Sequence, residues 1–286
     1  MKLNIFSLLN YLKKPRVQLG LVVLLGFVIR FYRISYPLLD WHAFRQADTA
    51  SVTYRYTQEG IDLLRPKYHD LSNIQSGLDN PEGYRMVEFP VVNGLIALTL
   101  LALPQAELVM TSRLFSILAS VGTMFSLYWL VKQVTSRSLA HATALASTAF
   151  FALLPFSIFY SRVVLPEPFF LFFSTLSLAL FVSWTRRSKI LHWWLSAVFL
   201  ALAFLLKPFA AFLAPVYLAT LILHRKNFYK DIKTYLFPVL AVVPFVFWRR
   251  WILNFPEGIP ASDWLFNQDG IRLRPAWFRW LFWERI

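Results

Sequence analysis

The sequence predicts an all-α protein that crosses a membrane several times, and three observations support this class. Of the 286 residues, 57% are hydrophobic and only 15% are charged. Several uninterrupted apolar runs approach the roughly 20 residues that span a bilayer as a helix. The net charge of +14 is concentrated near the ends of these runs, as expected when basic loops stay in the cytoplasm. We therefore expect membrane lipids as partners and no nucleic acid.

The apolar runs predict seven membrane spans. They lie at residues 17–36, 107–131, 138–160, 168–184, 190–206, 208–224 and 234–248. Lys13, Lys14 and Arg16 precede the first span and place the N-terminus in the cytoplasm. Because no small-residue cleavage site follows this run, we interpret it as a membrane helix and not as a removed signal peptide.

One further apolar run, at residues 90–103, is expected not to cross. It is short for a span. The later connectors around Lys132, Arg186 and Arg225 are basic, and all three fall in the cytoplasm only if this run returns to the side from which it came. We therefore expect an interfacial or re-entrant element inside a long outer loop at residues 38–106.

Two regions follow from this topology. Residues 1–248 form the transmembrane module, and residues 249–286 form an aromatic segment on the outer face, which we expect to begin a further loop of a longer protein. This segment is rich in tryptophan, as is typical of the membrane interface. Its five tryptophans are Trp251, Trp264, Trp277, Trp280 and Trp283.

The densest group of reactive side chains follows the first span, at residues 40–50 (DWHAFRQADTA). Apolar residues at helical spacing predict a short amphipathic helix at residues 43–58. Such a helix lies along the membrane interface. We expect Arg45, Asp48 and Thr49 to point away from its apolar face.

Six charged residues from separate parts of the chain reach the same outer face in this topology. They are Asp40, Asp48, Glu88, Arg113, Glu167 and Lys207. Charges beside a bilayer are costly unless they are paired or hydrated, so their convergence predicts one polar cavity.

Each of these residues also has a simpler interpretation. Asp40 would cap the following helix, and Asp48 would pair with Arg45 on the helix surface. Arg113 would extend its charge from an apolar helix toward the interface. Glu88, Glu167 and Lys207 would mark exposed turns or helix boundaries.

Several kinds of chemistry find no support in the sequence. The chain has no cysteine, no glycine-rich phosphate loop and no Gly-x-Ser-x-Gly motif. Its five histidines lack the spacing of metal ligands; they are His42, His69, His141, His192 and His224. We therefore expect no required cofactor, while a divalent cation held by carboxylates stays open.

Five short motifs, in this order, resemble those of the GT-C membrane glycosyltransferases. They are QADTA at 46–50, EFP at 88–90, TSRLFS at 111–116, SRVVLPEP at 161–168 and LAFLLKP at 202–208. The closest resemblance is to family 39, which includes protein O-mannosyltransferases and lipid A aminoarabinose transferases. The chain departs from the family pattern at Thr49, Phe89 and Glu167, where the family usually has an acid, a lysine and an aspartate.

The resemblance implies an inverting glycosyltransferase that uses a sugar carried on a polyprenyl phosphate. The acceptor would be a hydroxyl of a lipid, glycan or protein, and the site would lie on the extracytoplasmic side of the plasma (inner) membrane. Asp48 would be the general base, with Asp40 as the rival.

The same resemblance implies roles for the other charged residues of the outer face. Lys207 and Arg113 would stabilise the leaving phosphate, with Arg162 and Arg45 as further candidates. Glu88 and Glu167 would orient substrate or hold a divalent ion.

Two other classes remain open, a transporter and a flippase-like relative without glycosyl transfer. Against a transporter, the acids lie in loops and at helix ends, and paired broken helices are missing from the sequence pattern. The departures at Thr49 and Phe89 keep the second alternative open.

Overall fold

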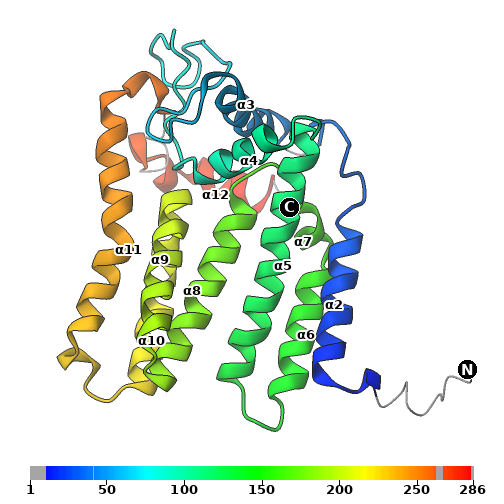
Figure 1. Cartoon of the computed structure of the whole chain (residues 1–286). Coiled ribbons are helices and arrows are strands. Elements are labelled where there is room, and N and C mark those ends of the chain that lie inside the picture. Colours follow the sequence, from blue (N-terminus) through cyan, green and yellow to red (C-terminus); the bar gives the residue numbers. More distant parts are fainter. Residues whose placement is uncertain (1–10, 41, 262–266, 285–286) are drawn as a thin grey trace, which may run out of the picture.

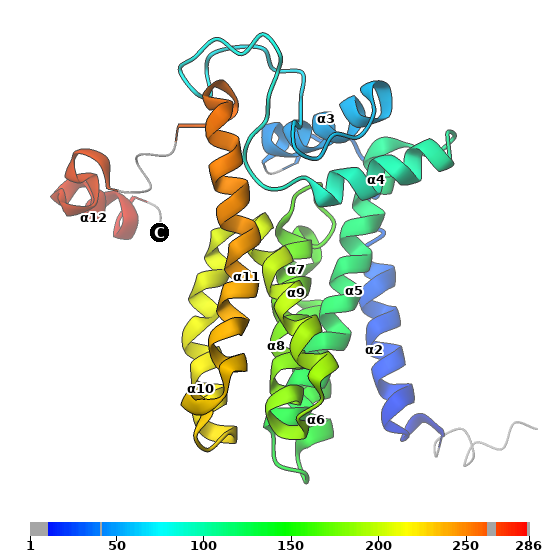
Figure 2. The same ribbon diagram turned by 60° about the vertical axis from the view of Figure 1, so that its left-hand side comes forward.

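The chain folds into a bundle of helices, one end of which is covered by shorter helices and loops (Figure 1, Figure 2). This computed structural model describes residues 11–40, 42–261 and 267–284. Within those ranges every regular element is a helix, and the only strand-like pairing is an isolated bridge between Lys67 and Tyr84. The expected all-α class is confirmed.

The bundle is built by helices that pack in a row. They are α2 (Pro15–Ile29), α5 (Leu108–Val134), α6 (Ala140–Leu153), α8 (Glu167–Arg187), α9 (Ile190–Leu206), α10 (Ala214–His224) and α11 (Ile232–Trp251). Helix α2 packs on α6, α6 on α5, α5 on α8, α8 on α9, and α9 on α11, while α10 packs on α8. Two of these pairs, α5 with α6 and α8 with α9, are consecutive in sequence and joined by short basic connectors; the others bring together helices that are separated along the chain.

Three helices in the described ranges are long and apolar enough to cross a membrane. They are Leu108–Val134, Glu167–Arg187 and Ile232–Asn254, the last of which joins α11 to the short 3₁₀ helix η3 (Ile252–Asn254). The other bundle helices are apolar but shorter, for example Pro15–Ile29 and Ile190–Leu206. They run alongside the long ones (Figure 1, Figure 2), and the count of seven spans stays a prediction.

Proline divides two of the expected spans. The expected span at 138–160 is two helices, α6 and α7 (Pro155–Tyr160). Leu154 between them is extended, with φ −62° and ψ 122°, because a residue before proline is disfavoured in the helical region. Similarly, the expected span at 208–224 opens with the 3₁₀ helix η1 (Pro208–Leu213) before α10 begins.

The apolar run at 90–103 forms α4 (Val91–Ala102). This helix lies across the end of the bundle and not along it (Figure 1, Figure 2), which agrees with the expectation that this run does not cross. It packs against α3 (Ala43–Glu59), the helix expected at 43–58. Asn93 joins the two, because its amide donates to the Thr49 carbonyl at 2.8 Å and to Thr53 Oγ1 at 2.9 Å.

The two ends of the bundle differ in charge. We call the end that carries the start of α2 the basic end, since it holds the connectors with Lys132, Arg186 and Arg225 (Figure 1). The opposite end, called the loop end, carries α3, α4 and the long acidic loop between them (Figure 1). The predicted segregation of basic connectors from the acidic outer loop is therefore present in the fold.

Part of the aromatic segment at 249–286 belongs to the loop end. Helix α11 runs past the expected boundary at residue 248 to Trp251, whose indole N–H donates to the Leu64 carbonyl at 2.7 Å. The Met86 N–H donates to the Gly258 carbonyl at 2.8 Å. A side chain at Gly258 would place its Cβ 2.7 Å from Tyr84 Cβ, so this close approach requires glycine. Trp264 lies outside the described residues.

An arginine not identified from the sequence ties α2 to the α6–α7 break. Arg30 is completely buried. Its guanidinium donates to the carbonyls of Gly26 and Ala152 at 2.7 and 2.9 Å, and to the hydroxyls of Ser157 and Ser161. The break at Pro155 matters here, because it turns the two serines toward α2.

Site-specific labelling is expected to separate the two ends. A cysteine placed at Ser188, on the basic end, should react with a membrane-impermeant thiol reagent only after the membrane is permeabilised, because positive loops are retained in the cytoplasm. A cysteine at Asn73, exposed on the loop end, is the matched control and should react in intact cells. Labelling of the Ser188 position from outside would overturn the assigned orientation.

Replacement of Arg30 by methionine is expected to destabilise the protein by on the order of 3 kcal/mol, since hydrogen bonds to a charged donor are the strong ones. The measurement is the midpoint of thermal unfolding in detergent. Arg249→Met is the control, because Arg249 is exposed and should change the midpoint little. Equal midpoints for the two variants would show that the Arg30 contacts contribute nothing.

Candidate functional site

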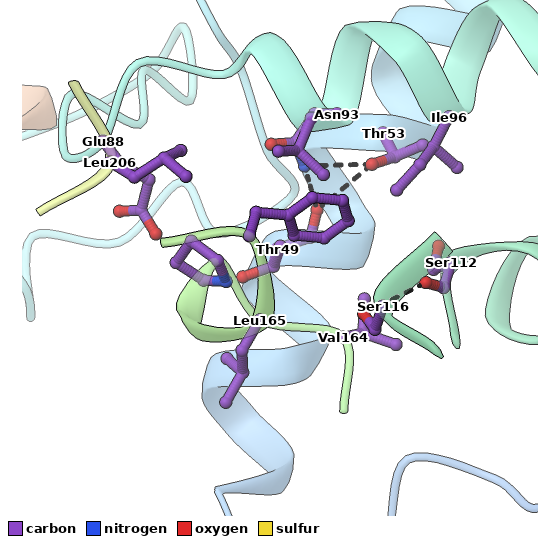
Figure 3. Close-up of a pocket in the computed structure, with 13 residues that line it drawn as sticks. Thr49, Thr53, Glu88, Asn93, Ile96, Ser112, Ser116, Val164, Leu165 and Leu206 are labelled. Atoms are coloured by element: carbon purple, nitrogen blue, oxygen red, sulfur yellow. Dashed lines mark hydrogen bonds between the residues drawn. The ribbon is translucent and has the colours of Figure 1, made fainter. Parts of the chain in front are cut away.

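The candidate site lies at the loop end, where two small cavities adjoin. They share Thr49, Glu88 and Asn93. The first extends toward α5 and α8 and is shown in Figure 3; its other lining residues include Ser112, Ser116, Val164, Pro166 and Leu206. The second extends into the acidic loop, toward Arg45, Asp48 and Arg85. Each holds about 20 Å³, which is room for about one water molecule.

Helix α3 presents its polar side to these cavities. Arg45, Asp48 and Thr49 line the second cavity, whereas Phe44 is 71% exposed. The partners of this side come from α4 and from the loop before it, and the periodicity of α3 alone does not reveal them.

Asp48 is held by a loop arginine that the sequence analysis missed. Arg85 Nη2 lies 3.0 Å from Asp48 Oδ2, and both side chains are largely buried. Gln75 donates to the same oxygen at 3.3 Å. The simpler interpretation, a pair between Asp48 and Arg45, is wrong for this structure, because Arg45 has another partner. The only sequence signal for Arg85 is a basic residue close before Glu88.

Arg85 is buried beside a second positive charge. Burial and then the Arg45 charge lower the pKa of the Arg85 guanidinium, against the opposite effect of Asp48. The guanidinium carbon also lies 5.2 Å from the centre of the Tyr68 ring. Arginine still stays protonated at neutral pH, so the Asp48 carboxylate faces a positive charge.

Arg45 forms the second ion pair, with Glu88. One guanidinium nitrogen lies 2.6 Å from both carboxylate oxygens. Burial alone would raise the pKa of Glu88, but the charges of Arg45 and Lys207 outweigh it and hold that pKa below its ordinary value. Glu88 is therefore a carboxylate at neutral pH and a fixed negative charge between two cations.

Lys207 and Glu167 form the third ion pair, at 3.1 Å. Lys207 follows the last residue of α9, and Glu167 is the first residue of α8. The Phe89 N–H donates to the Leu205 carbonyl at 2.9 Å, which brings Glu88 to the end of α9. Neighbours of this pair, Leu206 and Pro166, line the first cavity.

Asp40 lies beside the site without lining either cavity. It accepts a hydrogen bond from Gln46 Nε2 at 2.7 Å, and Gln46 Oε1 in turn accepts from the Val164 N–H at 3.0 Å. The N-cap of α3 is His42, in the left-handed region with φ 60°. Asp40 is therefore not the cap, and it joins the start of α3 to the 161–166 loop through Gln46.

Arg113 and Arg162 bind the chain itself in this structure. Arg113 is 1% exposed and donates to the carbonyls of Arg33, Ile34 and Tyr36. Its Nη2 lies 3.8 Å from Asp40. Arg162 donates to the Tyr32 carbonyl at 2.9 Å. Both guanidiniums therefore bind the connector between α2 and α3.

The structure groups no ready metal ligands. Within the described ranges no three His, Asp or Glu side chains lie close enough to hold an ion. Asp48, Glu88 and Glu167 each face a cation instead. The site therefore contains three carboxylates and three cations around two small cavities. Asp48 lines the second cavity, and Glu88 lines both.

The comparison with protein families gives one match. Residues 20–266 match the model of the dolichyl-phosphate-mannose-protein mannosyltransferases. This stretch includes α3, α4, the acidic loop and all three ion pairs. A comparison with curated proteins finds no match. Because the family match spans most of the chain, the protein belongs to the dolichyl-phosphate-mannose-protein mannosyltransferase family, whose members are membrane glycosyltransferases of the GT-C class.

Proposed function

We propose that this protein transfers a sugar from a polyprenyl-phosphate donor to an acceptor hydroxyl, with inversion at the anomeric carbon. The observation that carries the proposal is the family match across residues 20–266, which contains every charged residue of the site. The placement of Asp48 and Arg45 at the same cavity supports it, because a displacement needs a base for the attacking oxygen and a cation for the leaving phosphate.

Asp48 acts as the general base in this proposal. The acceptor oxygen attacks the anomeric carbon, its proton passes to an Asp48 carboxylate oxygen, and the bond from that carbon to the phosphate oxygen breaks. The phosphate leaves with the bonding electrons. Arg85 holds the Asp48 carboxylate in place through the contact at 3.0 Å.

Lys207 and Arg45 stabilise the departing phosphate. Both are partly exposed, at 22% and 20% of their side chains, whereas Arg113 is buried among carbonyls. Glu88 and Glu167 hold these two cations in position. A divalent ion between the carboxylates is the alternative means of neutralising the phosphate, and it would have to displace a cation already paired there.

The donor enters by separation of the layers that close the site. Cavities of about 20 Å³ do not accommodate a sugar, since ligand sites measure roughly 300–1,000 Å³. The contacts to be released are those between α3, the 161–166 loop and the end of α9. We place the site on the extracytoplasmic side of the plasma (inner) membrane, because the basic end is the one expected to stay in the cytoplasm.

We propose the sugar and the acceptor only as chemical classes. The family description names mannose on dolichyl phosphate and a protein acceptor. A hydroxyl of a lipid, glycan or protein suits the proposed base equally, since Asp48 needs only the proton of the attacking oxygen.

Asp48→Asn is expected to reduce turnover by about 10²–10⁴-fold, which is the usual contribution of a general base. Donor affinity should persist, because the amide has nearly the same shape as the carboxylate. Both are measured in proteoliposomes with a polyprenyl-phosphate sugar, as donor binding and as release of lipid phosphate.

Asp40→Asn is the matched control for this prediction. Asparagine still accepts the Gln46 hydrogen bond, so turnover should change little. Full turnover in Asp48→Asn together with loss in Asp40→Asn would move the base to Asp40. Full turnover in both variants would remove the support for this mechanism.

Lys207→Ala is expected to weaken donor binding by about ten- to a hundredfold, as for the loss of a hydrogen bond to a charged group. Turnover should fall as well, because charge on the phosphate grows as it leaves. Lys207→Arg should restore part of both, and Lys226→Ala, which removes a lysine at the basic end, should change neither. Unchanged donor affinity in Lys207→Ala would exclude Lys207 from the phosphate site.

A further inference from the structure

A larger hollow lies at the basic end, opposite the candidate site. It is formed where α5 ends, α6 begins and α8 ends, and it measures about 610 Å³. Its main lining residues are Trp129, Lys132, Gln133, Arg137, Arg186 and Arg187. Unlike the two cavities of the loop end, it has the size of an ordinary ligand site.

The charge in this hollow is of one sign. Four of its lining residues are cationic and none is acidic. In the described part of the chain none of the four has a carboxylate partner. The next basic connector shows the contrast, because Arg225 pairs with Asp231 at 3.3 Å and covers the Trp184 ring at 4.0 Å.

The end of α8 accounts for only part of this charge. Arg186 and Arg187 lie in its last turn, where the helix dipole favours cations. Lys132 and Arg137 come from another helix and the loop after it, and the fold brings them to the same hollow. An anionic group with several oxygens would bind such a concave surface, where four cations lie without a carboxylate partner among the described residues.

A second hollow joins the first through Lys132. It measures about 630 Å³ and combines Lys14 and Arg16 with apolar side chains, among them Val17, Leu19 and Tyr128. Basic residues therefore lie next to an apolar surface along α2 and α5. This combination matches a lipid, whose phosphate lies at the membrane surface and whose acyl chains run along the helices.

We propose that the basic hollow binds the phosphate headgroup of an anionic phospholipid. Arg186, Arg187, Lys132 and Arg137 contact the phosphate oxygens, and the acyl chains lie against the apolar part of the neighbouring hollow. The site is separate from the glycosyl-transfer site, and it would hold the ends of α5, α6 and α8 together at the basic end.

The test measures retention of phosphatidylglycerol by the purified full chain in phosphatidylcholine micelles, by native mass spectrometry. The double variant Arg186→Gln/Arg187→Gln should weaken phosphatidylglycerol binding by at least about tenfold. Lys226→Gln/Lys230→Gln removes the same charge from the same end but outside the hollow, and it should leave binding unchanged. The unfolding midpoint in phosphatidylcholine alone checks that each variant is folded.

Three results would overturn the proposal. Equal loss in the two double variants would indicate general attraction to an anionic surface. Saturation by inorganic phosphate, with no added effect of phosphatidylglycerol, would assign the hollow to a soluble anion. Unaltered binding in the Arg186/Arg187 variant would remove the site. If that variant does not fold, Lys132→Gln replaces it under the same criteria, and none of these outcomes depends on glycosyl transfer.

Discussion

Charge placed against a membrane must be neutralised, and the loop end of this protein is organised around that constraint. Three ion pairs, Asp48 with Arg85, Arg45 with Glu88, and Lys207 with Glu167, join α3, the acidic loop, α8 and α9. None of these partners is a neighbour in sequence, so each pair closes a long stretch of chain. Glu88 shows most clearly how burial and charge oppose each other. Burial alone would raise its pKa, but the charges of the two nearby cations lower that pKa below its ordinary value. Removing one partner would leave an unpaired charge in a largely buried place. The free-energy cost of that unpaired charge is far larger than the stabilisation that the pair provides.

Backbone contacts determine where these charges meet. The Phe89 N–H on the Leu205 carbonyl and the Trp248 indole N–H on the Val87 carbonyl hold the residues on either side of Glu88. The side-chain amide of Asn93 likewise joins α4 to α3 through hydrogen bonds. The segment at 87–93 therefore links α3, α9 and α11, since it contacts all three. Its Pro90 stops any helix from beginning earlier, because it fixes the backbone and removes a donor.

Much of the fold follows from composition and loop charge, but the partners within the site do not. Apolar runs and basic connectors predicted the all-α class, the helix at 43–58 and the non-crossing run at 90–103. They did not predict the break at Pro155, although the proline itself was a sufficient signal. The contacts of the polar side of α3 were not predicted, since Arg85, Glu88 and Asn93 approach from distant parts of the chain. For the same reason the contacts of Arg113 were not predicted: the carbonyls that bind it, between residues 33 and 36, have no signature in sequence.

The same pairing places a condition on how the proposed donor binds. Each cation that would meet the phosphate already holds a carboxylate, so the phosphate must compete with Glu88 or Glu167 for Arg45 or Lys207. Glu167 is the easier partner to displace, because 44% of its side chain is exposed, against 12% for Glu88. A carboxylate released into water keeps its hydration, whereas one released inside the fold does not. Lys207 therefore exchanges Glu167 for phosphate at lower cost than Arg45 exchanges Glu88. In the proposed mechanism, Arg45 therefore stays paired with Glu88, and Lys207 is the cation that moves with the departing phosphate.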